Sequence, residues 1–266
     1  MGVGVEAQTP LQTLPQLESD AGENISYDLC MQLRMQPVEG DNTLEGKEED
    51  LKFYTDSLYI DQMRGGVNTG GRMTRKRTIH DLRKIARVRQ SEWWARVFDE
   101  LIFMYMSGAR GVNADYIFPT SYAGFAGNSL VAPDSAHLMY AGAATSKATI
   151  TNAMPMDLTL IERAVTKAST LGGGTSGIPA IEPIKIDGEE RYVLVMHPFQ
   201  AHALRNNSST GQWLDIQKAL ATAVGNKSPI FVGGMGFHRG VVLHEHRAVI
   251  RYSDYGAGSN LAAARA

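Results

Sequence analysis

The sequence has 266 residues, of which 43% are hydrophobic and 20% charged, and its formal net charge at pH 7 is −2. This composition excludes a disordered or fibrous chain and is typical of a folded protein with one large or two small domains. The single cysteine, Cys30, excludes an internal disulfide framework. The near-zero net charge argues against a protein whose main role is to coat nucleic acid.

Targeting and membrane signals are missing from the patterns of this sequence. Residues 1–10 have neither a basic start nor an apolar core, so they do not resemble a secretory signal. The longest strictly apolar run, residues 101–106, is far shorter than the roughly 20 residues of a membrane-spanning helix. We therefore expect a cytosolic product without a membrane segment.

The first 35 residues predict an arm followed by a strand. Residues 1–24 show no apolar periodicity and are expected to form an extended N-terminal arm. Residues 25–34 place Ile25, Tyr27, Leu29 and Met31 at alternate positions, which predicts a short strand. Cys30 lies within this pattern and is expected to be a buried structural cysteine.

Charge is distributed unevenly in the next segment. Seven acidic residues lie between positions 39 and 56, and ten basic residues lie between positions 64 and 96. Two solvated faces would explain this pattern, and so would electrostatic complementarity between copies of the chain, in which an acidic loop meets a basic neighbour. The candidate inter-subunit residues are Glu45, Glu48, Glu49, Asp50, Arg64, Arg72, Arg75, Lys76, Arg77 and Arg83.

A hairpin and a long helix are predicted for residues 51–107. Residues 51–63 have strand composition and lead into a glycine-rich stretch, residues 65–71, which predicts a long hairpin around that tip. Apolar residues then recur at helical spacing over residues 78–107, with Thr78 and Asp81 as a capping-box-like start and Gly108 as the stop. Such a helix is roughly 40 Å long. Its Trp93–Trp94 pair is expected in a core or an interface rather than in a base-stacking platform.

The rest of the chain predicts an irregular segment and an α/β module. Residues 111–155 carry three formal charges and are expected to dock against another surface, in the same chain or a neighbour. A helix capped by Asp157 and closed by Gly172 follows, and the hairpin signal Asp187–Gly188 separates strands at 184–186 and 192–195. Further elements are expected as a helix over 198–204, a helix from 210 or 211, and strands at 229–232, 241–246 and 248–252.

Candidate catalytic motifs are weak. His244 and His246 would share one face of a strand near His238, and zinc takes three such ligands, but the spacing is not the helical one of zinc proteases. The glycines at 172–177 follow a helix instead of preceding one, so a connector is expected there rather than a phosphate loop. We therefore expect no catalytic, cofactor or metal site. Two alternatives stay open: a metal-dependent hydrolase using these three histidines, and a nucleic-acid-binding protein using the basic stripe from Arg72 to Arg96.

Several longer segments resemble one family. They are GDNTLEGKEE (40–49), YIDQMR (59–64), the stretch from Arg77–Thr78 to Trp93–Trp94, SGARG (107–111), YVLVMHP (192–198), GQW (211–213), PIFVGGMG (229–236) and residues 241–252. They resemble the major capsid proteins of tailed bacteriophages with the Hong Kong 97-like fold, in the group related to the podovirus-type coliphage N-four.

This resemblance implies an α+β fold with defined parts. These are an N-terminal arm (1–24), a peripheral-domain strand (25–35), an extended loop that overlies a neighbour (36–76), a spine helix with an irregular peripheral segment (77–155) and a mixed α/β axial domain (156–256). Residues 257–266 would begin the return to the peripheral domain, so the biological protein is expected to be longer.

The resemblance also implies a function and partners. The chain would be a non-enzymatic major capsid protein that self-assembles as pentamers and hexamers into an icosahedral head around double-stranded DNA. Scaffolding, portal or decoration proteins would be its partners, and its contact with packaged DNA would be weak. It would be made in the cytoplasm of a bacterial host and end in the virion.

Overall fold

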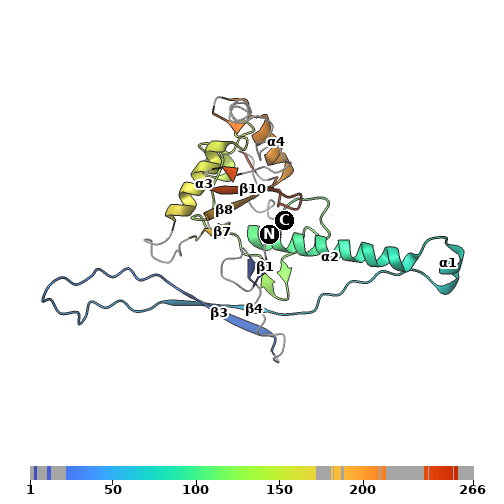
Figure 1. Cartoon of the computed structure of the whole chain (residues 1–266), viewed down its shortest axis with the longest axis horizontal. Helices are drawn as coiled ribbons and strands as arrows, with labels where there is room; N and C mark the ends of the chain where they lie inside the picture. The colour runs from blue at the N-terminus through green and yellow to red at the C-terminus, as the bar shows by residue number, and fades with distance from the viewer. Residues whose placement is uncertain are drawn as a thin grey trace. The chain divides into compact units, whose positions relative to one another are not determined.

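The computed structural model describes residues 3–4, 11–12, 22–171, 181, 183–186, 189–209, 211–213, 237–238, 240–253 and 255–256. The chain divides into two compact units. Unit 1 contains Met1–Ile60, Ser135–Thr145 and Asn152–His246, and unit 2 contains Asp61–Asp134, Ser146–Thr151 and Arg247–Ala266. Both helices and strands are present, as predicted for an α+β protein (Figure 1). The expected strand at 229–232 and most of the expected helix from 210 or 211 lie outside the described residues.

Unit 1 contains a two-stranded ribbon. β3 (Asn24–Cys30) pairs antiparallel with β4 (Phe53–Tyr59), so the first predicted strand is confirmed but ends at Cys30. The predicted hairpin around the glycine-rich tip is wrong. β4 pairs with β3, the strand that precedes it in the chain, and the glycines that follow β4 lead into a helix. In the N-terminal region, β1 (Val3–Gly4) and β2 (Leu11–Gln12) form a short parallel pair.

A four-stranded sheet forms the centre of the α/β part of unit 1. Its order is β7 (Ile184–Ile186), β8 (Glu189–Met196), β10 (Val241–Glu245) and β9 (Phe237–His238). The β8–β10 pair is parallel and the two outer pairs are antiparallel. The predicted strands at 184–186, 192–195 and 241–246 are therefore confirmed, while the Asp187–Gly188 turn lies outside the described residues.

Two helices flank this sheet, and local sequence signals start both of them (Figure 1). α3 (Leu158–Thr170) begins at the predicted cap, where the Asp157 carboxylate accepts a hydrogen bond from the Leu160 amide at 2.7 Å. α4 (Pro198–Asn206) begins with Pro198, whose fixed φ suits the first turn. The predicted stop of α3 at Gly172 lies outside the described residues, and the helix is capped by Leu171.

The core of this part joins the helices to the strands. Its buried members are Leu158, Ile161, Met196, Ala201, Leu204, Trp213, Val241 and Leu243. Burying one Leu, Ile or Met side chain stabilises a fold by about 1.5–3 kcal/mol. Helix, strand and the first described turn after α4 are thus held by one apolar cluster.

Unit 2 is organised around one long helix. α2 (Leu82–Ser107) follows the short α1 (Arg72–Arg77), and the predicted start at Thr78 is wrong, because Asp81 is the N-cap and accepts from the Lys84 amide at 3.2 Å. The predicted stop is confirmed, since Gly108 caps the helix with φ 67°, a left-handed conformation that suits glycine. The buried positions Val97, Glu100 and Met104 define the inner face of α2.

Residues 111–155 are mostly irregular, as predicted. The part of this segment that belongs to unit 2 contains the short hairpin β5 (Gly124–Phe125) and β6 (Asn128–Ser129) and the 3₁₀ turn η2 (Lys147–Thr149). The expected strand at 248–252 does not form in these described residues. Their backbone is bound by the loop that follows α2, partly through side chains, so no ladder is made.

Candidate functional site

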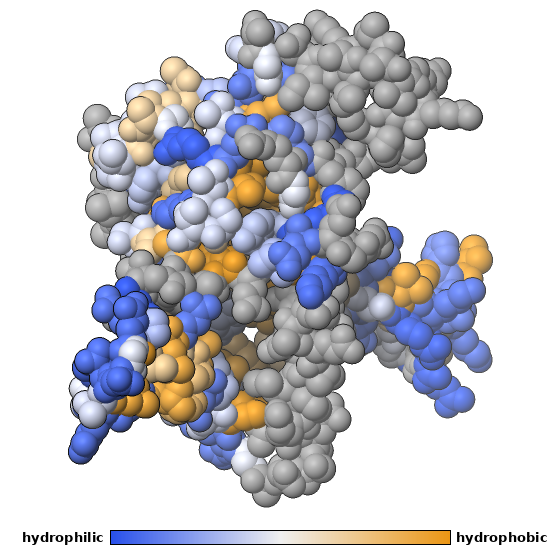
Figure 2. All heavy atoms as spheres, turned by 60° about the vertical axis from the view of Figure 1, so that its left-hand side comes forward, coloured by the Kyte–Doolittle hydropathy of each residue, from blue (hydrophilic) through white to orange (hydrophobic). Residues whose placement is uncertain are grey.

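One face of the β3–β4 ribbon is mostly apolar. Because paired residues share a face and successive pairs alternate, five apolar side chains lie together on this face with Asp56, while Phe53 and Tyr59 lie on the opposite face among polar residues. That apolar face contains Ile25, Tyr27, Leu29, Tyr54 and Leu58. Tyr27 is 42% exposed and Tyr54 55% exposed, so this face is uncovered in the single chain. Figure 2 shows such hydrophobic groups at the surface beside hydrophilic ones.

Side-chain bonds fix the register of the ribbon. Tyr27 donates its hydroxyl to Asp56 at 3.0 Å on the apolar face, and Thr55 donates to Asp28 at 2.5 Å on the opposite face. Partial burial, followed by the bond and charge of Asp56, raises the pKa of Tyr27. A one-residue slip would exchange the two faces and break both bonds, so the apolar face is a specified surface.

The acidic candidates lie in the loop between the two strands, residues 31–52. Glu45, Glu48 and Asp50 are exposed, and Glu49 is half-buried. Glu48 accepts a hydrogen bond from the Gly46 amide at 2.7 Å, and Glu49 accepts from the Arg34 amide. These bonds shape the loop and leave the negative charges without a basic partner among the described side chains.

The basic candidates lie in α1, the first turn of α2 and the segment before them. Arg72, Lys76 and Arg77 are exposed on α1, and Arg83 is exposed on α2. The side chain of Arg75 lies outside what is described. Arg64 is exposed and donates to Gln62 at 3.0 Å. Among the ion pairs between described residues, none involves Arg64, Arg72, Lys76, Arg77 or Arg83.

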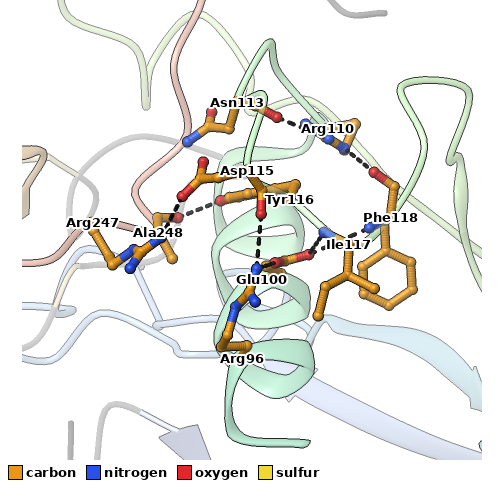
Figure 3. A network of polar contacts seen from close by, with 10 residues as sticks. All are labelled: Arg96, Glu100, Arg110, Asn113, Asp115, Tyr116, Ile117, Phe118, Arg247 and Ala248. Atoms are coloured by element: carbon orange, nitrogen blue, oxygen red, sulfur yellow. Dashed lines mark hydrogen bonds and ion pairs between the residues drawn. The ribbon is translucent and has the colours of Figure 1, made fainter. Parts of the chain in front are cut away.

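A buried polar network in unit 2 lies outside the predicted sites (Figure 3). Arg110, only 3% exposed, donates to the carbonyl oxygens of Phe118 at 2.9 Å, Gly111 at 3.3 Å and Asn113 at 3.0 Å. Its guanidinium also lies 4.5 Å from the centre of the Tyr116 ring. Carbonyl groups and an aromatic face thus replace the water that this cation would otherwise bind.

Glu100 holds the other side of the same loop. Its carboxylate, from the inner face of α2, accepts from the amides of Ile117 at 2.8 Å and Phe118 at 3.4 Å, with Arg96 at 3.9 Å. Burial raises the pKa of Glu100, and the two amide bonds and the nearby arginines partly oppose that shift. The carboxylate therefore anchors the loop to the helix at the cost of its own hydration.

The network ends on residues 247–251. Asn113 donates from Nδ2 to the Val249 carbonyl at 3.0 Å and accepts at Oδ1 from the Arg251 amide at 2.8 Å. Tyr116 donates its hydroxyl to the Ala248 carbonyl (Figure 3). One asparagine thus pairs with a donor and an acceptor of the same passing backbone.

Two further contacts hold the same segment. The Val112 amide donates to the Arg251 carbonyl at 2.9 Å. An ion pair of 2.8 Å joins Arg247 to Asp115, and this bond lowers the pKa of Asp115. The arrangement has the chemistry of a structural latch.

Sequence reasoning missed this latch, although two signals could have indicated it. Glu100 is a lone acid on the apolar side of the predicted helix, and Arg110 is a lone base at the edge of a segment that is poor in charge. Buried charges are retained in folds where each is paired or hydrogen-bonded.

The histidines do not form a metal site in the described part of the chain. The rings of His244 and His246 are stacked with centroids 6.3 Å apart, and His238 Nε2 lies 3.4 Å from Glu162. No three His, Cys, Asp or Glu side chains come together among the residues that the structure describes. The hydrolase alternative therefore gains no geometric support there.

Two other expectations can be compared with the structure. Cys30 is exposed, so the prediction of a buried cysteine is wrong, because it lies on a ribbon whose two faces are both accessible in the single chain. None of the helices in the described ranges is long and apolar enough to cross a membrane.

Comparisons with known proteins agree on one family. The model of the family described as phage capsid protein matches residues 3–266. The chain is 27% identical to the major capsid protein of Pseudomonas phage KPP25 over 254 residues. This match covers 94% of the present chain and 66% of that relative. The chain thus spans slightly less than two thirds of the length of this curated relative.

Two solved structures are similar over nearly the whole chain. The capsid of Ralstonia phage GP4 matches with a TM-score of 0.82 and 50% identity, covering 97% of this chain and 70% of that one. The capsid asymmetric unit of cyanophage Pam1 matches with a TM-score of 0.71 and 19% identity, covering 97% and 72%. At that identity the second match concerns the fold alone.

Proposed function

The chain belongs to the phage capsid protein family, and from this premise we propose that it is the major structural subunit of an icosahedral bacteriophage head that encloses double-stranded DNA. The observation that carries the proposal is the β3–β4 ribbon, whose apolar face is uncovered in the single chain. A two-stranded ribbon is marginally stable alone and gains stability when its apolar face is covered. In the assembled shell a neighbouring copy covers it.

The finer architecture is part of the proposal. We assign a Hong Kong 97-like fold, in which residues 36–76 are the extended loop, α2 is the spine helix of the peripheral domain and the α/β part of unit 1 belongs to the axial domain. The mixed helix and strand content and the two capsid structures that match over 97% of the chain support this assignment. Residues 1–24 are the N-terminal arm in this scheme.

Assembly proceeds through many weak contacts between copies. The acidic loop of one copy, with Glu45, Glu48, Glu49 and Asp50, meets the basic residues of its neighbour, which are Arg64, Arg72, Arg75, Lys76, Arg77 and Arg83. Each exposed pair contributes only about 0–1 kcal/mol. Repetition over a closed symmetric shell makes their sum large and sets the register and the choice of partner.

Other partners follow from the same role. Copies associate as pentamers and hexamers, and scaffolding, portal or decoration proteins join them. The exposed bases of α1 and α2 make at most weak contact with packaged DNA. The subunit is made in the bacterial cytoplasm and functions in the virion without a catalytic, cofactor or metal site.

Negative-stain electron microscopy of the expressed product tests the role. Uniform icosahedral shells or capsomer rings are expected. A product that stays monomeric under all assembly conditions, or that carries stoichiometric zinc and hydrolytic activity, would overturn the proposal.

Charge reversal tests the contact mechanism. The double variant Glu48→Lys with Glu49→Lys is expected to impair shell formation while leaving the far-ultraviolet circular dichroism of the subunit unchanged. The matched variant Glu48→Gln with Glu49→Gln keeps the side-chain length and removes only the charge, so an intermediate yield is expected. Normal shells from the lysine variant at low salt would contradict the charge complementarity. This result would leave the capsid role intact, because that role is tested by shell formation of the wild-type chain.

A further inference from the structure

The segment that joins β4 to α1 has an unusual attachment to α2. Residues 61–71 are all described, and none of them lies in a helix or strand. Gln90 of α2 donates from Nε2 to the Gly65 carbonyl at 2.8 Å. A Cβ atom on Gly65 would lie 2.3 Å from Cζ3 and 2.7 Å from Cη2 of Trp93. The backbone at residue 65 therefore lies directly against the indole ring.

The need for glycine here is steric and not conformational. Gly65 is not among the glycines with a left-handed φ, so its backbone accepts other residues. The neighbouring Gly66 also lacks a left-handed φ, and a Cβ there would meet nothing within 4 Å. Two adjacent glycines thus differ in one respect, the presence of Trp93.

The indole ring of Trp93 is itself held in place. It packs edge-on against Trp94 with centroids 4.7 Å apart, and Trp94 stacks on Phe98 at 5.8 Å. Such aromatic pairs contribute stability beyond the area that they bury. A side chain at residue 65 would have to disturb this aromatic row or lift the segment away from α2.

We propose that Gly65, Gln90 and Trp93 form a clasp that fixes residues 61–71 to α2 before assembly, and that this clasp is a positioning site for shell formation. The inference rests on the proposed capsid role. It adds to that role a specific place where the free subunit is prepared for assembly.

The physical reason is conformational entropy. A free segment of this length samples many conformations, and the ribbon at its other end would sample them too. Ordering the segment during association would add an entropic cost and make the free energy of association less favourable. A clasp that orders the segment in the free subunit removes this entropic cost in advance.

Four variants of the full chain separate the steric contact from general damage. Gly65→Ala inserts the clashing methyl group, and Gly66→Ala adds the same group in open space as the matched control. Trp93→Leu alone removes the ring, and Gly65→Ala with Trp93→Leu gives the new methyl group the space that the ring leaves. The double variant is expected to lie closer to wild type than Gly65→Ala does, because the two changes are coupled.

Two measurements give the result. Amide exchange of residues 61–71 in the unassembled subunit is expected to be about tenfold faster in Gly65→Ala than in wild type, the scale of a core overpacking change. The subunit concentration at half-maximal shell formation is expected to rise by a similar factor, about tenfold. Gly66→Ala should change neither quantity.

The outcomes separate this inference from the capsid role. Wild-type exchange in Gly65→Ala would overturn the clasp. Faster exchange with unchanged assembly would overturn the positioning role and leave the capsid role intact. Equal effects of Gly65→Ala and Gly66→Ala would overturn the steric argument. If the wild-type chain forms no shells at all, the proposed function fails. The contact of Gly65 with Trp93 is then tested by the exchange measurement alone.

Discussion

Replacing Asn113 with alanine is expected to release residues 248–251 from the loop that follows α2. In the native chain this side chain, in a residue that is 2% exposed, accepts from the Arg251 amide at 2.8 Å and donates to the Val249 carbonyl at 3.0 Å. Alanine removes both partners and leaves one backbone donor and one backbone acceptor unpaired. The substitution leaves the bond that the Asn113 backbone carbonyl accepts from Arg110 in place.

The magnitude follows from the burial of the two freed groups. An unpaired buried polar group costs about 1–3 kcal/mol. Arg251 is exposed and Val249 is half-buried, so water reaches part of each site. The penalties for the Arg251 amide and the Val249 carbonyl together amount to about 2–6 kcal/mol. Because water reaches both, we expect the free energy of local opening to fall by about 2–3 kcal/mol, near the lower end of that range. This corresponds to roughly 30- to 150-fold faster amide exchange.

Hydrogen exchange at the Arg251 amide measures this local opening directly. Asn42→Ala is the matched control, because Asn42 is exposed and its side chain makes one bond, to the Glu39 carbonyl at 2.7 Å. That control should leave exchange at 248–251 unchanged. Wild-type protection of the Arg251 amide in Asn113→Ala would refute the assignment of the latch to this side chain.

Three further predictions follow from the backbone and the buried charge. Ala126, with φ 55°, is the non-glycine residue with positive φ in the described part of the chain, so Ala126→Gly should raise the unfolding free energy by about 1 kcal/mol, while Ala123→Gly should not; a lower melting temperature for Ala126→Gly would contradict this. Gly108→Ala should lower the unfolding free energy by about 2 kcal/mol or more in urea titration, because φ is 67° and the Cβ would lie 2.1 Å from the Val131 carbonyl oxygen; wild-type stability would refute it. Burial raises the pKa of Glu100 above its ordinary 4.5, so the native state binds this proton more tightly than the unfolded chain does, and the corresponding stability is complete at low pH and is lost as pH rises through the native pKa. Glu100→Gln should flatten that decline in urea unfolding above the ordinary pKa of 4.5, and an unchanged slope would count against the argument.

Local signals predicted the elements of the α/β part well. Asp157 and Pro198 begin α3 and α4 as expected, because caps and first-turn prolines act within a few residues of chain. Gly108 ends α2 for the same reason. Continuous apolar runs at residues 192–196 and 241–243 were enough to indicate β8 and β10, which lie side by side at the centre of the sheet.

Elements that depend on distant partners were less accessible. Near the start of α2 both Thr78 and Asp81 are plausible caps, and the structure uses Asp81 and leaves Ile79 fully exposed. The glycines at 65–71 suggested a hairpin tip, whereas β4 pairs with β3 across the acidic loop. Pairing across some twenty residues leaves no local mark that would separate it from pairing around the nearby glycines.

The candidate contact residues illustrate the limit for function. Charge patterning in the sequence selects acidic and basic sets, and most of their described members are exposed in the single chain. The latch could not be derived in this way, because Asn113 and Arg251 are separated by 138 positions. Only the fold brings such groups together.

The latch also orders events during synthesis. Its segment, residues 247–251, is synthesised after the loop at residues 112–116 that it binds, so these contacts can form only once the chain has been made through residue 251. Contacts of high sequence separation also form late in folding, since a long loop must close first. A nascent chain that stops early therefore cannot fill the loop at Asn113. A chain that ends before residue 247 therefore lacks the backbone groups that Asn113 and Tyr116 bind in the complete unit 2.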